Sequence, residues 1–67
     1  MGEKVNYLST YTKGNLTAET FYDKKEKSYG IDMFEDNKFQ QRELFPNHSE
    51  EYAENAAENY VFGIKKI

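Results

Sequence analysis

The sequence predicts an α+β fold: an antiparallel β-meander of three or four strands with one C-terminal α-helix packed on one face. Two observations predict this fold. Residues 5–45 hold four segments rich in β-branched and aromatic side chains, separated by short turn motifs. Residues 50–62 repeat apolar side chains at helical spacing. The chain of 67 residues makes a single small domain, 1–67, with no room for a second.

The first two strands are predicted over residues 5–12 (VNYLSTYT) and 16–23 (LTAETFYD). Gly14 and Asn15 between them suit a two-residue type II′ turn, because glycine readily takes a positive φ. The facing pairs are then Tyr7 with Tyr22, Leu8 with Phe21, and Tyr11 with Ala18. Since side chains alternate along a strand, this register puts the three tyrosines on one face and Leu8 and Phe21 on the other.

The third strand is predicted over residues 28–35 (SYGIDMFE) and the fourth over 38–45 (KFQQRELF). The charged run at 24–27 forms a loop, and Asp36-Asn37 forms a tight turn, because Asn tolerates the left-handed conformation. The third strand directs Tyr29, Ile31 and Met33 inward, and the turn pairs Glu35 with Lys38 and Phe34 with Phe39.

The fourth strand does not follow a simple alternation. Strict alternation places Phe39 and Phe45 on one side and Leu44 on the other. We therefore expect either a β-bulge or a shorter strand in this segment. Pro46 ends the strand, because proline has no N–H to donate to a ladder.

The helix is predicted over residues 50–62. Ser49 is a favourable N-cap, and Gly63 suits the left-handed position after the last turn. Small or apolar side chains recur at i, i+3, i+4, i+7 and i+8, at Ala53, Ala56, Ala57, Tyr60 and Val61. Alanines on this stripe let the helix backbone come close to the sheet.

The composition argues against an enzyme and against any cofactor or metal. There is no cysteine, and His48 is the single histidine, so thiolate and multi-histidine sites are excluded. Glycine-rich phosphate loops and nucleophile motifs are missing. Asp32, Glu35 and Asp36 lack the spacing of a calcium loop, which favours a role in the turn. We expect His48 to be a partly exposed residue just before the helix.

No apolar run long enough to span a membrane is present, and the N-terminus does not have the pattern of a signal peptide. A cytoplasmic protein is therefore expected. The net charge of −3 argues against a general nucleic-acid binder, which needs a basic footprint.

The aromatic content is high, with six tyrosines and five phenylalanines. One helix covers one face of the sheet, so rings on the other face are exposed or meet a partner. Three interpretations remain open: a surface that binds another protein or a second copy of the chain, a nucleic-acid surface, or rings that pack among themselves. In the nucleic-acid case, tyrosines stack on bases while phosphates meet Lys13, Lys24, Lys25 and Lys27.

The candidate partner-binding residues on the sheet are Tyr7, Tyr11 and Tyr22. If the helix covers the tyrosine face, the exposed candidates become Leu8, Phe21 and Phe34.

The predicted helix also carries glutamates four residues apart, at Glu50, Glu54 and Glu58. Each such pair of like charges costs ~0.2–0.5 kcal/mol in an isolated helix. A solvated helix face is the simpler explanation. The alternative is that Glu51, Glu54 and Glu58 offer a negative strip to a basic partner surface.

The segment 46–64 (PNHSEEYAENAAENYVFGI) resembles the ends of small uncharacterised proteins carried by tailed, cyanophage-like bacteriophages of marine bacteria. The resemblance rests on residues 46–49, the alanine stripe and residues 60–63, and it transfers no site. It implies a viral accessory protein that binds or modulates a host protein, located in the host cytoplasm. We therefore expect a small non-enzymatic protein-binding protein. The alternatives are a sheet-based nucleic-acid-binding module and a homodimeric structural protein.

Overall fold

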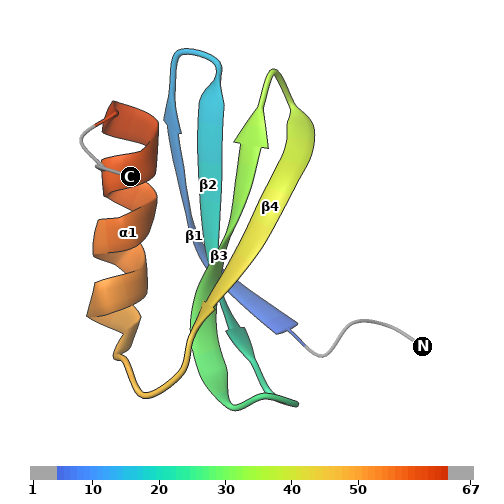
Figure 1. Ribbon diagram of the computed structural model, residues 1–67, viewed down its shortest axis with the longest axis vertical. Helices are drawn as coiled ribbons and strands as arrows, with labels where there is room; N and C mark the ends of the chain where they lie inside the picture. The colour runs from blue at the N-terminus through green and yellow to red at the C-terminus, as the bar shows by residue number, and fades with distance from the viewer. Residues whose placement is uncertain (1–4, 64–67) are drawn as a thin grey trace.

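The computed structural model describes residues 5–63 and confirms the α+β fold. Four antiparallel strands follow one another across the sheet in chain order, and a single helix follows them. The elements are β1 (Val5–Lys13), β2 (Leu16–Asp23), β3 (Ser28–Glu35), β4 (Lys38–Phe45) and α1 (Glu50–Phe62). Figure 1 shows the meander and the return of the chain from β4 to α1.

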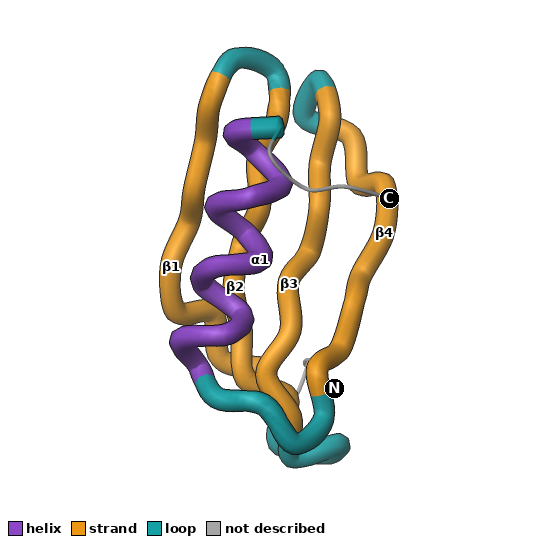
Figure 2. Tube along the Cα trace, turned by 60° about the vertical axis from the view of Figure 1, so that its left-hand side comes forward, coloured by secondary structure: helices purple, strands orange, loops and turns teal. Residues whose placement is uncertain are grey.

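The helix lies across one face of the sheet and packs mainly on β2, then on β3 and β1 (Figure 2). The core between the layers consists of Ala18, Ile31, Met33, Phe45, Ala53, Ala57 and Val61. Ala53 and Ala57 of α1 are buried against the sheet, as the helical spacing predicts, and Ala56 is half-buried beside them. Tyr60 packs at the edge of this core and donates a hydrogen bond from its hydroxyl to the Phe34 carbonyl at 3.1 Å.

The two ends of α1 follow from local sequence. Ser49 has an extended backbone, and its Oγ accepts a hydrogen bond from the Tyr52 N–H at 3.3 Å. Gly63 has φ 72°, the left-handed conformation that glycine adopts without steric cost. His48, just before the cap, is exposed and stacks on the Tyr52 ring with 3.8 Å between centroids.

Both tight turns have the backbone geometry that their residues favour. In the β1–β2 turn Gly14 has φ 61°, as a type II′ turn requires of its first central residue. In the β3–β4 turn both Asp36 and Asn37 have positive φ, which is the pattern of a type I′ turn. That turn pairs Glu35 with Lys38 and Phe34 with Phe39, as predicted.

A β-bulge in β1 makes two of the predicted pairs wrong, Tyr7 with Tyr22 and Leu8 with Phe21. Tyr11 lies opposite Ala18 as predicted, but the register shifts between Tyr7 and Ser9 and leaves Leu8 as an extra residue. Tyr7 therefore pairs with Phe21, and Asn6 pairs with Tyr22. Since one inserted residue reverses the facing of every side chain beyond it, Tyr7 lies on the opposite face from Tyr11 and Tyr22.

A second bulge lies in β4, where the sequence predicts a bulge or a shorter strand. Met33 pairs with Gln41 and Phe34 with Phe39, so that Gln40 is the extra residue. As a result Phe39 shares a face with Leu44, and Phe45 turns to the other side to join the core under α1.

Candidate functional site

The face of the sheet that α1 leaves uncovered is built from all four strands, and we call it the open face. The strand registers arrange its side chains in three rows. The rows are Tyr7, Phe21, Gly30 and Leu44; Thr10, Glu19, Asp32 and Arg42; and Thr12, Thr17, Phe34 and Phe39. A polar row thus runs between two rows that carry aromatic and aliphatic side chains.

An ion pair stands at the centre of the open face. Arg42 donates from Nε to Asp32 Oδ1 at 2.6 Å and from Nη2 to Asp32 Oδ2 at 2.9 Å. The Tyr7 hydroxyl donates to the same Oδ2 at 3.1 Å and accepts from Arg42 Nη2 at 3.3 Å. The Asp32 side chain is only 4% exposed. Paired donors that match both carboxylate oxygens hold such a group in a fixed geometry.

This arrangement corrects the role predicted for Asp32. Glu35 and Asp36 do lie at the β3–β4 turn, but Asp32 lies within β3 and faces across to β4. The oxygens of Asp32 are occupied by hydrogen-bond donors of Arg42 and Tyr7. Within residues 5–63, no group of three or more His, Cys, Asp or Glu side chains is placed to hold a metal ion.

Phe21 belongs to the open face and is nevertheless 0% exposed. Phe21 pairs with Gly30 of the neighbouring strand β3. A Cβ atom at Gly30 would lie 2.8 Å from the Phe21 ring, so the absence of a side chain there makes room for the ring. The Arg42 guanidinium lies over the ring at 4.5 Å, and the Tyr7 ring meets it edge-on at 6.1 Å. The prediction that Phe21 is exposed when the helix covers the other face is therefore wrong.

Around this buried centre the open face exposes large apolar side chains. Tyr7 is 52% exposed, Phe39 56% and Leu44 37%. Phe39 meets the half-buried Phe34 in an edge-to-face contact at 5.8 Å, which restricts both rings. Leu8, at the bulge, is exposed as well. The open face therefore combines an ordered polar centre with an apolar periphery.

The other two predicted tyrosines lie on the helix side. Tyr22 packs against the Tyr29 ring at 4.9 Å between centroids, and Tyr11 packs against the core. Burial raises the pKa of Tyr11 above its ordinary value of 10.0, and the nearby negative charges of Glu54, Glu58 and Glu50 raise it further. The structure thus brings Tyr11 close to the predicted acidic residues and separates it from Tyr7.

The predicted negative strip consists of Glu51, Glu54 and Glu58, and we call these residues the acid strip. Their spacing of three and four residues places them on one side of α1. Glu51 and Glu58 are exposed, and Glu54 is half-buried. Since Glu54 and Glu58 act on the pKa of Tyr11, the acid strip lies on the side of α1 that borders β1.

Arg42, Phe39 and Leu44 were not predicted as site residues. A signal for Arg42 exists in the sequence, because a bulge after the β3–β4 turn brings Arg42 opposite Asp32. The same bulge places Phe39 and Leu44 together on the open face. These residues can therefore be placed on the open face from the sequence only if the bulge is assigned to Gln40.

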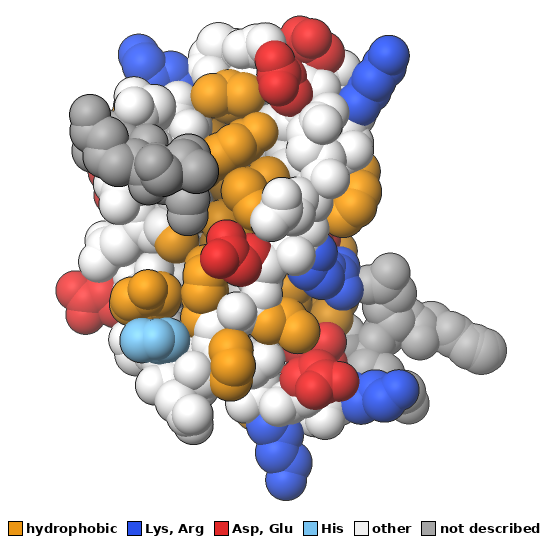
Figure 3. Space-filling view, viewed as in Figure 1, with side chains coloured by type: hydrophobic (Ala, Val, Ile, Leu, Met, Phe, Trp, Pro, Cys, Tyr) orange, Lys and Arg blue, Asp and Glu red, His pale blue; other side chains and the backbone are white. Residues whose placement is uncertain are grey.

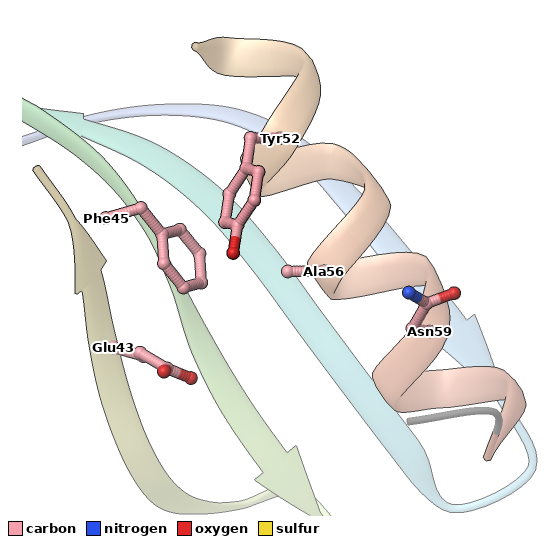
Figure 4. A pocket seen from close by; sticks show the side chains of 5 residues that line it. All are labelled: Glu43, Phe45, Tyr52, Ala56 and Asn59. Atoms are coloured by element: carbon pink, nitrogen blue, oxygen red, sulfur yellow. The ribbon is translucent and has the colours of Figure 1, made fainter. Parts of the chain in front are cut away.

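A groove lies between α1 and β4, because the helix packs mainly on the other three strands (Figure 4). Its volume is about 210 Å³, and its lining is Glu43, Phe45, Tyr52, Ala56 and Asn59. Figure 3 shows a band of hydrophobic side chains along this side of the molecule. Organic ligands usually occupy pockets of ~300–1,000 Å³, so this groove is too small to hold one of ordinary size.

No family model, curated protein or solved structure matches this chain. Over the part of the chain that the structure describes, no helix is long and apolar enough to cross a membrane.

Proposed function

We propose that this chain is a protein-binding module without catalytic activity, and that it holds its partner on the open face. The observation that carries the proposal is the exposure of Tyr7, Phe39 and Leu44 on a sheet face that no other described element covers. Aromatic side chains and arginine supply most of the binding energy in protein interfaces. An exposed group of such residues on a small chain is typical of an interaction surface.

The fixed centre of the open face supports this proposal. Tyr7 is held by its hydrogen bond to Asp32, and Arg42 is held by two hydrogen bonds to the same carboxylate. Ordering a flexible side chain at an interface costs ~0.5–1.5 kcal/mol. Because these two side chains are already ordered, less of the binding energy is lost when a partner arrives.

The distribution of charge favours a protein over a nucleic acid as the partner. Lys13 ends β1 beside the β1–β2 turn, whereas Lys24, Lys25 and Lys27 lie in the β2–β3 loop at the other end of β2. Eight strand residues separate the two ends, which is a distance of roughly 25 Å. On the open face itself Glu19 lies opposite Asp32, so the polar row holds two acids and one base.

The resemblance of residues 46–64 to phage proteins extends the proposal. On this basis, the chain is an accessory protein of a tailed bacteriophage, and its partner is a host protein in the host cytoplasm. The resemblance alone supports the phage origin and the host partner.

The test compares two variants in an affinity purification from host lysate. The double variant Phe39→Ser/Leu44→Ser removes exposed apolar groups from the open face, and Phe62→Ser removes an exposed ring from α1. We expect the first variant to lose a partner that the wild-type chain and the second variant retain. A partner that binds all three equally would refute a role for the open face.

Two further measurements separate the alternatives. Light scattering over a range of concentrations detects a homodimer. If the open face is the dimer interface, the double variant Phe39→Ser/Leu44→Ser stays monomeric at concentrations where the wild-type chain dimerises. Titration with a fluorescent single-stranded oligonucleotide reports nucleic-acid binding, which must weaken with rising salt. A salt-sensitive complex with the oligonucleotide would replace the proposed function by the nucleic-acid alternative.

A further inference from the structure

The two edges of the sheet differ in how they are protected. β1 and β4 are the outer strands, and an outer strand presents backbone N–H and C=O groups that another strand can pair with. β4 carries Lys38, Arg42 and Glu43 and has a bulge at Gln40, features that discourage pairing. β1 carries no charged residue from Val5 to Thr12, and its bulge lies near its start. Residues 9–13 of β1 therefore form a regular edge that is uncharged as far as Thr12 and ends with Lys13.

The edge of β1 lies beside negative charge. α1 packs on β1, and the charges of Glu50, Glu54 and Glu58 act on Tyr11 in the middle of the regular segment. At the end of β1, the Lys13 Nζ lies 5.7 Å from the centre of the Phe62 ring, which marks the end of the helix on this side. A strand added to β1 would therefore run alongside the acid strip.

We propose that the outer edge of β1 binds an extended segment of another protein that carries lysine or arginine at alternate positions. The added strand pairs with residues 9–13 and becomes a fifth strand of the sheet. Its side chains alternate between the two faces, so every second one lies on the helix side, next to Tyr11 and below Glu54 and Glu58. Basic side chains beside Tyr11 meet opposite charge, whereas the position beside Lys13, on the same face, favours an uncharged side chain. This surface is separate from the open face.

A second copy of the chain is a poorer occupant of the same edge. Antiparallel pairing of two β1 strands about a two-fold axis perpendicular to the sheet puts both helices on the same side of the joined sheet. The acid strip of each copy then faces that of the other across the axis. Like charges placed in this way oppose the pairing, whereas a basic segment gains from the same arrangement.

The backbone groups available for pairing follow from the turn. In a two-residue hairpin the two residues that flank the turn, here Lys13 and Leu16, exchange backbone hydrogen bonds. Every second residue of β1 before Lys13, namely Tyr11 and Ser9, is hydrogen-bonded to its partner in β2 in the same way. Thr12 and Thr10 fall between these positions, so their N–H and C=O groups point away from β2. A proline at Thr10 removes one outward N–H and leaves the pairing with β2 in place.

The test uses the full chain and fluorescein-labelled synthetic peptides eight residues long. One peptide alternates lysine and threonine, a second alternates glutamate and threonine, and a third is the lysine peptide with N-methyl groups on alternate amides. Fluorescence anisotropy measures binding, and amide NMR shifts locate it. We expect the lysine peptide alone to bind, to shift the amides of residues 9–13, and to bind less tightly as the salt concentration rises.

Matched variants separate the contributions of charge and backbone. Glu54→Lys/Glu58→Lys should weaken binding of the lysine peptide about tenfold, because two attractions become repulsions. Glu26→Lys/Glu35→Lys changes the net charge equally at exposed positions outside β1 and α1, in the β2–β3 loop and at the end of β3, and should have at most a small effect. Thr10→Pro should abolish binding while the thermal unfolding curve stays close to that of the wild type.

Each alternative result overturns the inference in a recognisable way. If the lysine peptide does not bind, or binds both charge variants equally, the acid strip does not select the partner. If Thr10→Pro and N-methylation leave binding unchanged, the contact is electrostatic and no strand is added. Neither result affects the open face, which the Phe39→Ser/Leu44→Ser comparison tests separately.

Discussion

Arg42 lies directly opposite Asp32 across the β3–β4 ladder, and its guanidinium holds both carboxylate oxygens at 2.6 and 2.9 Å. The same guanidinium lies over the ring of Phe21. One side chain therefore neutralises a buried acid and covers a buried ring. This relationship explains how a sheet face without a covering helix can still have an ordered centre.

Replacing Arg42 by methionine should lower the free energy of unfolding by about 2–4 kcal/mol. The change leaves the buried Asp32 carboxylate without its opposite charge, although the Tyr7 hydroxyl still donates to it. Urea denaturation followed by circular dichroism measures the loss. The double variant Asp32→Leu/Arg42→Met should recover much of it, because an apolar pair replaces the ion pair and no charge is left buried. A double variant as unstable as Arg42→Met would contradict this explanation.

Gly30→Ala should destabilise the protein by about 1–3 kcal/mol, because the added methyl group overpacks a filled site. A Cβ at this position would lie 2.5 Å from the Glu43 carbonyl oxygen and 2.8 Å from the Phe21 ring. The Phe21 ring or β4 must then shift, and the contact between the Arg42 guanidinium and the Phe21 ring is lost. Thermal unfolding checks the effect. Gly14→Ala, at a turn glycine with open space around it, separates crowding from backbone strain, since only strain at positive φ applies there.

Ser49→Ala should cost about 1 kcal/mol of folding free energy, because the Tyr52 N–H loses its capping acceptor. Ser49→Asp keeps an acceptor at the same place and adds a negative charge at the helix N-terminus, so it should retain or raise stability. Urea denaturation of the two variants provides the comparison. Equal losses in both would show that the hydroxyl does not act as a cap.

The fold could be predicted from the sequence because its signals are local. Ser49 and Gly63 delimit the helix, and the two tight turns set the pairs next to them, such as Phe34 with Phe39. The bulge at Gln40 could be anticipated, because strict alternation would separate Phe39 from Leu44 and put Phe39 on the side of Phe45. Each of these predictions depends on residues only a few positions apart.

The bulge at Leu8 could not be predicted in the same way. Phe21 and Tyr22 put an aromatic ring on each face of β2, so pairing Tyr7 with Tyr22 or with Phe21 satisfies the hydrophobic pattern equally well. The choice depends on contacts distant in sequence: Phe21 over Gly30, and Tyr7 with Asp32. Of the predicted sheet residues, Tyr7 is therefore on the open face, whereas Tyr11 and Tyr22 lie on the helix side.

Stability should fall as the pH rises above 10. Burial raises the pKa of Tyr11 and of Tyr60 above the ordinary value of 10.0, and nearby glutamates, Glu35 in the case of Tyr60, raise it further. The folded protein then binds the phenol protons more tightly than the unfolded chain does. The stabilisation that results from these two protonated phenols is fully present below pH 10. It is lost as the pH rises through their raised pKa values in the folded protein.

The free energy of unfolding, measured by urea denaturation from pH about 8 to about 11.5, tests this dependence. The double variant Tyr11→Phe/Tyr60→Phe should show a flatter decline, because neither position can then ionise. It should also be less stable at neutral pH by about 1 kcal/mol, since the hydrogen bond from Tyr60 to the Phe34 carbonyl is lost. The exposed Tyr52 provides the control: if Tyr52→Phe flattens the decline as much as the double variant does, the two half-buried tyrosines are not its source.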